Sequence, residues 1–183
     1  MGYTADASGE KNWLQRLAEK IPGLAGYHAK ENRRDADKLY RDALADRLRK
    51  VKDVIATSTR ELTDGGRMLE IAPLERVSKK IDTLESRIRY ASYGYSGFFD
   101  AVQIKEQQLD QLYQFDLRLV EKVEAIETQA AALRTRIGTP TELKAGLADL
   151  EQVADDLSST FDTRFQAING FGADAAPGRP LFQ

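Results

Sequence analysis

Few residues of this sequence have the types and spacing that catalysis requires. The chain has 183 residues, no cysteine and a single histidine, His28, so it cannot assemble the Cys and His ligand sets of most zinc sites or a Cys–His nucleophile pair. The Glu-x-x-His pairs of di-iron helical proteins do not occur, and no glycine-rich phosphate loop follows a strand. We therefore expect no catalytic residue, no metal and no cofactor, and we predict that the protein is not an enzyme.

The residues best suited to binding form an aromatic cluster, Tyr90-Ala-Ser-Tyr-Gly-Tyr-Ser-Gly-Phe-Phe-Asp100, which we call the aromatic elbow. Aromatic rings give a large contact area at modest entropic cost and are common in interface hot spots. The alternative is that the rings fold inward and cap the ends of the helices, with Asp100 as a first-turn acid that complements a helix dipole. The candidate interaction residues of the elbow are Tyr90, Tyr93, Tyr95, Phe98, Phe99 and Asp100.

Asp116 is a polar residue at a position where the helical pattern expects an apolar one. It lies between Leu112 and Leu119, which are spaced as in a heptad. If Asp116 is buried, it needs a partner such as an arginine or a tyrosine hydroxyl. A polar group in an apolar seam more often sets register than catalyses a reaction, and we add Asp116 to the candidate interaction residues.

A second candidate surface lies near the N-terminus. Residues 10–21 have the spacing of a short amphipathic helix, which Pro22-Gly23 ends. Its apolar face could anchor the chain to a membrane surface or to a partner; the alternative is that it packs on the protein's own helices. The candidate anchor residues are Trp13, Leu14, Leu17 and Ile21.

The elements that position these residues are long helices. Apolar residues recur at steps of three and four, which predicts helices over about 28–62, 73–90, 98–137 and 139–169. Helix ends are predicted at Asp64-Gly65-Gly66, Gly138 and Asn169-Gly170. First turns are predicted at Pro73 and Pro140. The predicted seams are Leu44, Leu48, Val51, Ile55, Ser58 and Leu62, widened by Leu39, Tyr40 and Val54; Leu74, Val77, Ile81, Leu84 and Ile88; Val102, Leu109, Leu112, Leu119, Val123, Ile126, Ala130, Leu133 and Ile137; and Leu143, Leu147, Leu150, Ala154, Leu157, Phe161 and Ile168.

These seams predict an all-α fold, namely an elongated antiparallel helical bundle or coiled coil of about four long helices plus the short N-terminal amphipathic helix. We expect a flexible N-terminus over 1–9, one helical domain over 10–170 and a flexible tail over 171–183. The charged stretch 30–38 has i,i+4 pairs such as Arg33–Asp37 and Asp37–Arg41, which indicate a solvated, self-paired helix face. A phosphate-binding role for Arg33 and Arg34 is the alternative.

The charge and the hydrophobic pattern of the chain limit the kinds of partner that it can bind. The net charge is −2, which gives no general attraction to nucleic acid. No apolar run approaches the roughly 18–20 residues of a spanning helix, and no signal peptide pattern is present. We therefore expect a cytoplasmic protein, with peripheral contact at the inner membrane as an option, and no nucleic-acid partner.

Two stretches resemble an uncharacterised family of bacterial all-helical proteins. The first is Ile21-Pro-Gly-Leu-Ala-Gly-Tyr27 with Lys30-Glu31, Arg33-Arg34 and Ala36-Asp37-Lys38. The second is Tyr93-Gly-Tyr-Ser-Gly-Phe-Phe-Asp-Ala-Val102 with Leu109-Asp110 and Leu112-Tyr113-Gln-Phe-Asp116. The resemblance spans about residues 10–137 and implies no activity. It marks the elbow, the Pro-Gly link and Asp116 as features of the family.

The function that the sequence favours is a non-enzymatic helical scaffold or adaptor that acts through protein–protein interaction and self-association. Its protein partner is unknown, and a homo-oligomer is expected. The alternative is a peripheral membrane-associated coiled-coil protein anchored by the N-terminal amphipathic helix.

Overall fold

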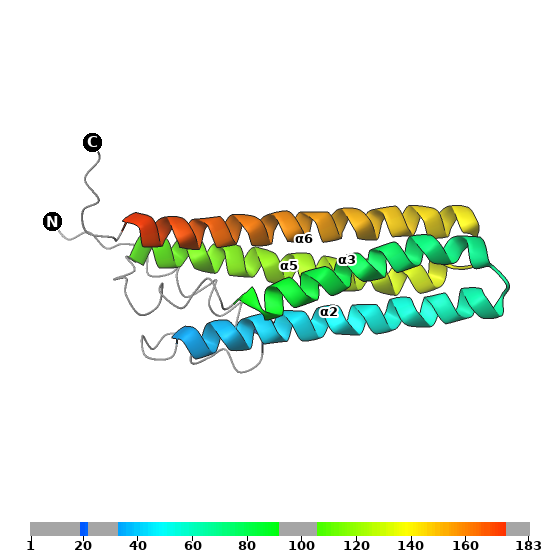
Figure 1. Cartoon of the computed structure of the whole chain (residues 1–183), viewed down its shortest axis with the longest axis horizontal. Coiled ribbons are helices and arrows are strands. Elements are labelled where there is room, and N and C mark those ends of the chain that lie inside the picture. The colour runs from blue at the N-terminus through cyan, green and yellow to red at the C-terminus, as the bar shows by residue number, and fades with distance from the viewer. Residues whose placement is uncertain (1–18, 22–32, 92–105, 175–183) are drawn as a thin grey trace, which may run out of the picture.

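The computed structural model describes residues 19–21, 33–91 and 106–174. Four long helices account for most of them: α2 (Arg33–Asp64), α3 (Ile71–Arg89), α5 (Glu106–Arg136) and α6 (Pro140–Asp174), with a 3-10 turn, η3 (Met68–Glu70), before α3. No strand occurs in these ranges, so the predicted all-α class is confirmed. The helices lie side by side, and the two short connections, from α2 to α3 and from α5 to α6, share one end, which we call the loop end (Figure 1). The opposite end is the elbow end; α5 begins there, while the shorter α3 stops before reaching it (Figure 1).

One apolar core runs between the four helices. Each helix packs on two neighbours, α2 on α3 and α5, and α6 on α3 and α5. The predicted seam residues whose side chains are described are buried, with three exceptions. Val54 and Ile137 are partly buried against the core, and Leu39 is exposed. Leu39 is a wrong prediction because 42% of it is exposed; the neighbouring Tyr40 is fully buried instead. Val102, Leu109 and Ile168 lie outside the described side chains.

The end of α2 shows how the local sequence shapes the turn. Gly66 has a φ of 71°, and the amides of Gly66 and Arg67 donate to the carbonyls of Thr63 and Leu62 at 3.0 and 2.8 Å. This is a Schellman motif, in which a residue with positive φ satisfies the last carbonyls of a helix. The predicted stop at Asp64-Gly65-Gly66 is therefore confirmed. Helix α3 begins at Ile71, slightly before the predicted Pro73.

The C-terminal boundary was predicted wrongly. Asn169-Gly170 was expected to end the last helix and residue 171 to open the tail, but α6 continues to Asp174. Glycine favours a helix end because it adopts left-handed backbone angles easily, but it can also adopt helical angles. Inside a helix, glycine lowers helix stability by about 1 kcal/mol relative to alanine. A helix as long as α6 tolerates that cost.

Ser58 is the one polar residue in the middle of the α2 seam, and it leads to a stability prediction. It is 0% exposed, and its Oγ has no hydrogen-bond partner in the described part of the chain. Burying an unpaired hydroxyl costs about 1–3 kcal/mol. We expect Ser58→Ala to raise the free energy of unfolding, measured by urea denaturation, by about 1 kcal/mol or more.

The matched control is Ser159→Ala at an exposed site of α6. It isolates the gain in helix propensity, which is about 0.5 kcal/mol. If Ser58→Ala stabilises no more than this control, the buried hydroxyl is not a cost to the fold.

Candidate functional site

Four charged residues continue the buried seams at the elbow end. Asp37 and Arg41 lie on α2, Asp116 on α5 and Arg164 on α6, and their exposed fractions are 2, 4, 0 and 0%. We call these four residues the ionic layer. Each occupies a heptad position, because alternating steps of four and three connect it to buried seam residues. The runs are 37, 41, 44, 48 in α2; 112, 116, 119 in α5; and 157, 161, 164 in α6. The core therefore changes from apolar to ionic near this end.

Arg164 joins three helices. Its Nε donates to Asp116 Oδ1 at 2.5 Å, and its Nη2 donates to Asp37 Oδ1 at 2.8 Å. Its guanidinium carbon also lies 5.9 Å from the centre of the Tyr40 ring, within the range of a cation–π contact. A planar guanidinium can donate in several fixed directions, which lets one side chain hold α5 and α2 against α6.

Arg41 joins α2 to the end of α3. Its Nε donates to Asp37 Oδ2 at 2.8 Å, and its Nη1 donates to the backbone carbonyl of Arg89 at 2.8 Å and, more weakly, of Ile88 at 3.4 Å. The last carbonyls of a helix have no intrahelical donor and carry the negative end of the helix dipole. Arg41 is thus a side-chain cap for the C-terminus of α3.

Tyr40 completes the connections between the helices. Its hydroxyl donates to the backbone carbonyl of Asp116 at 2.6 Å. The two aspartates and two arginines of the ionic layer have formal charges that cancel. Buried charges are tolerated when they are paired and hydrogen-bonded, and this layer meets both conditions.

The expectations for the charged residues are confirmed in one case and wrong in another. The prediction that a buried Asp116 needs an arginine or a tyrosine hydroxyl is confirmed, since Arg164 binds its carboxylate and Tyr40 its carbonyl. The Asp37–Arg41 pair exists, but its predicted place on a solvated face is wrong. Sequence reasoning missed Arg164, although its heptad position between Phe161 and Ile168 was a visible signal.

The other predicted site residues are only partly described. Tyr90, which directly follows α3, is 67% exposed, and its backbone amide donates to Ser86 O at 3.0 Å. Ile21 is 1% exposed and belongs to the apolar core, and the adjacent Lys20 pairs with Glu124 of α5 at 2.5 Å. Residues outside the described ranges are Tyr93, Tyr95, Phe98, Phe99, Asp100, Trp13, Leu14 and Leu17.

The ionic layer is closed to solvent, so it can hold helices in register but does not present a reacting group to a substrate. In the described ranges, no three His, Cys, Asp or Glu side chains gather as a metal site would need. Among the same residues, every helix is too short or too polar to cross a bilayer.

Ion pairs on the outer surface connect neighbouring helices and shift the pKa values of the residues that form them. The pKa of Asp46 lies below its ordinary 3.8 because Arg89 of α3 donates to its carboxylate at 2.9 Å. The pKa of Asp156 is lowered in the same way by Lys122 of α5, at 3.0 Å. In the other direction, a hydrogen bond to Asp82 raises the pKa of Lys52 above 10.5.

These shifts predict how stability depends on pH. A lowered aspartate pKa adds stability above the unfolded pKa of about 3.9, which is lost as the pH falls through the folded value. A raised lysine pKa adds stability below about 10.5, which is lost as the pH rises further. We therefore expect the free energy of unfolding to be highest between about pH 5 and 9 and to fall on both sides.

Urea titrations across the pH range measure this dependence. Asp46→Asn combined with Asp156→Asn should flatten the acid side without changing the alkaline side. High salt should reduce the pH dependence of the free energy of unfolding on both sides, because the ion pairs are exposed and salt screens them. An acid limb that is unchanged in the double variant would contradict the assignment.

Comparison of the chain with protein-family models, with curated proteins and with solved structures finds no match. The resemblance to bacterial all-helical proteins therefore stays a prediction.

Proposed function

We propose that the chain is an elongated antiparallel four-helix bundle that acts as a non-enzymatic scaffold or adaptor in the bacterial cytoplasm. It works through protein–protein interaction and self-association, with the aromatic elbow as the docking surface for a protein partner. The shared apolar core and the heptad positions of all four helices support the bundle. The elbow follows α3 directly, so the end of α3 is the part of the molecule on which this proposal depends.

The hydrogen bond from Arg41 to the carbonyl of Arg89 carries the proposal. Arg89 is the last residue of α3, and its carbonyl is held at 2.8 Å by a side chain that belongs to the ionic layer. Asp116, in the same layer, belongs to α5, the helix that follows the elbow. Both helices flanking the elbow are therefore tied into one buried network. Holding the flanks in place reduces the entropy that a docking segment loses on binding.

Tyr90 supplies the second support. The side chain of Tyr90 is 67% exposed and directly follows a fixed helix end. A partner can therefore bind it at little cost to the stability of the fold. Tyrosine is enriched at the energetic centres of protein interfaces.

The test is a variant that removes aromatic area from the elbow. Phe98→Ala with Phe99→Ala should abolish capture of the partner by the full chain, first in a pull-down and then with the purified partner, while helicity and melting temperature stay close to wild type. Met68→Ala removes an exposed apolar side chain (63% exposed) at the loop end and should leave capture intact. If the double variant melts well below wild type, the rings belong to the core and the docking proposal fails.

The membrane alternative has lost one of its anchor residues. Ile21 is buried in the core rather than available to lipid, so the N-terminal segment would have to dock through Trp13, Leu14 and Leu17 alone. Vesicle flotation with wild type and Trp13→Asp tests this alternative, and flotation that the substitution abolishes would favour it over the scaffold.

A further inference from the structure

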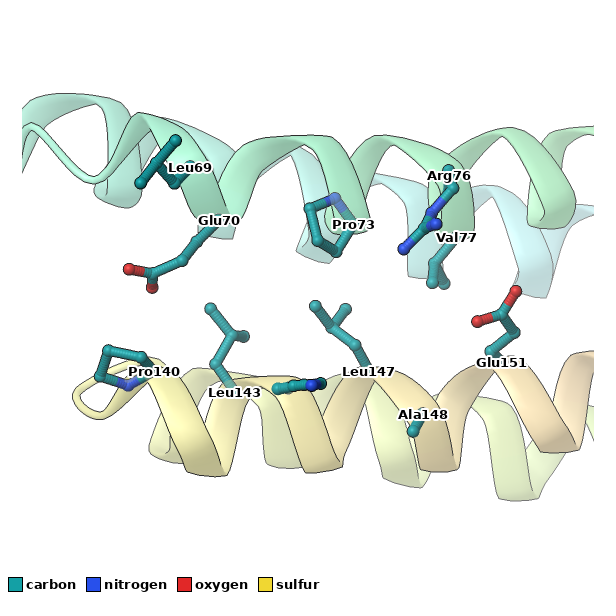
Figure 2. A pocket seen from close by; sticks show the side chains of 11 residues that line it. Leu69, Glu70, Pro73, Arg76, Val77, Pro140, Leu143, Leu147, Ala148 and Glu151 are labelled. Carbon is teal, nitrogen blue, oxygen red and sulfur yellow. The ribbon is translucent and has the colours of Figure 1, made fainter.

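An open apolar groove lies at the loop end between the first turns of α3 and of α6. Leu143 and Leu147 point from α6 toward Pro73 and Val77 of α3, with a gap between the two sets of side chains (Figure 2). The groove has a volume of about 400 Å³. This is large enough for one or two apolar side chains of a binding partner.

A protruding apolar turn stands at the edge of the groove. Leu69, which also lines it, is 94% exposed, and the preceding Met68 is 63% exposed. Both residues belong to η3. Single exposed apolar side chains need no explanation, but two adjacent ones that adjoin an apolar groove form a continuous patch of the kind that marks interaction sites.

The charges around this face complement each other. Arg76 and Lys144 line the groove and are exposed, and neither makes an ion pair within the described part of the chain. The acid beside the protruding turn is Asp64, the last residue of α2; it is exposed and also lacks an ion pair within the described residues. Two acids, Glu70 and Glu151, also line the groove, but each is already paired, with Arg67 and Lys80 respectively. The charges left unpaired in the groove are therefore basic, while the unpaired charge beside the turn is acidic.

We propose that a second copy of this chain covers this face, with the Met68–Leu69 turn of each copy seated in the groove of the other. A surface that carries both a projection and its matching groove, with opposite free charges, is self-complementary. Two copies related by a two-fold axis satisfy both contacts at once. This surface deepens the self-association of the proposed function and rests on it, but it is separate from the aromatic elbow.

The first test is the mass of the full chain in solution. Sedimentation velocity over a range of concentrations should give a dimer of twice the 20.5 kDa chain mass for the wild type. Leu69→Glu should raise the dimer dissociation constant by about tenfold or more, as expected for an anchor residue in an apolar pocket. Leu39→Glu, a leucine that is 42% exposed on α2 and outside the groove, is the matched control and should remain a dimer.

A second variant changes the groove instead of the protruding turn. Ala148 is an exposed residue of α6 that lines the groove, so Ala148→Trp should fill it and prevent dimerisation without touching the core. Because the chain has no cysteine, chains with Leu69→Cys and chains with Ala148→Cys can be mixed and oxidised. They should form a mixed disulfide more readily than either forms with itself.

The outcomes separate this inference from the elbow proposal. Loss of dimerisation in Leu69→Glu and Ala148→Trp, with dimerisation kept in Phe98→Ala/Phe99→Ala, supports the groove interface. A wild type that stays monomeric, or a dimer that survives both groove variants, overturns it. Capture of the elbow's partner should be unchanged in Leu69→Glu. A dimer that survives both groove variants therefore overturns only the groove interface, whereas a monomeric wild type also removes the proposed self-association and leaves the docking role of the elbow standing.

Discussion

Arg164→Ala should lower the free energy of unfolding by about 3–5 kcal/mol, because it removes one partner from a buried ion-pair network. The guanidinium of Arg164 is 0% exposed and bonds both Asp116 and Asp37. After truncation, the carboxylate of Asp116 stays buried without its arginine, and the helices lose a link between α6, α5 and α2. Urea denaturation followed by circular dichroism measures the loss.

A surface arginine provides the control. Arg87 of α3 pairs with Asp162 of α6, and its side chain is 39% exposed. Arg87→Ala should cost less than about 1 kcal/mol, because exposed ion pairs contribute little. Similar losses for Arg164→Ala and Arg87→Ala would mean that the ionic layer is accessible to water.

A double-mutant cycle separates the value of the ion pair from the cost of an unpaired charge. Asp116→Ala combined with Arg164→Ala should destabilise by less than the sum of the two single variants, because the second truncation removes the charge that the first left without a partner. Additive effects would show that the two side chains act independently of each other.

Leu48→Ala should cost about 2–5 kcal/mol, the range for a fully buried leucine replaced by alanine. Leu48 is 0% exposed in the centre of the α2 seam. The loss combines the transfer energy of the removed methyl groups with the cavity left between helices that cannot fully collapse. Chemical denaturation with the same probe as above measures it.

Leu39→Ala is the matched control on the same helix. Leu39 is 42% exposed, so its truncation removes little buried area and should cost less than about 1 kcal/mol. Equal losses at the two leucines would mean that Leu39 is buried by something beyond the described contacts, such as a partner surface.

The apolar part of the fold could be predicted because its signal is local. A seam such as Leu74, Val77, Ile81, Leu84 and Ile88 needs only the helical period and residue type to be recognised, and all five residues are buried. Leu39 and Tyr40 mark the limit of this reasoning. Adjacent apolar residues differ by about 100° around a helix, and only the positions of the neighbouring helices decide that Tyr40 faces inward.

The ionic layer could not be predicted in the same way. A pair such as Asp37 and Arg41 has the same i,i+4 spacing on a buried face as on a solvated one, and charged residues are usually assigned to the surface. What decides the matter is Arg164, which is 127 residues from Asp37 in sequence. Its position depends on how α6 packs on α3 and α5 so that its side chain reaches α2, and this is tertiary information. Of the four residues, the sequence pattern placed only Asp116 in a seam. The other three fit the heptad register, but their residue types argued against burial.

The cap that Arg41 forms on α3 has a consequence for how this protein can change in length. Because a side chain of α2 bonds the carbonyl of the last residue of α3, the two helices are aligned at the elbow end, while the Schellman turn joins them at the loop end. Insertions of whole heptads next to that turn, matched in α2 and α3 and in α5 and α6, would keep every seam and leave the cap in place. Related chains of different length should therefore vary at the loop end and keep a constant elbow end.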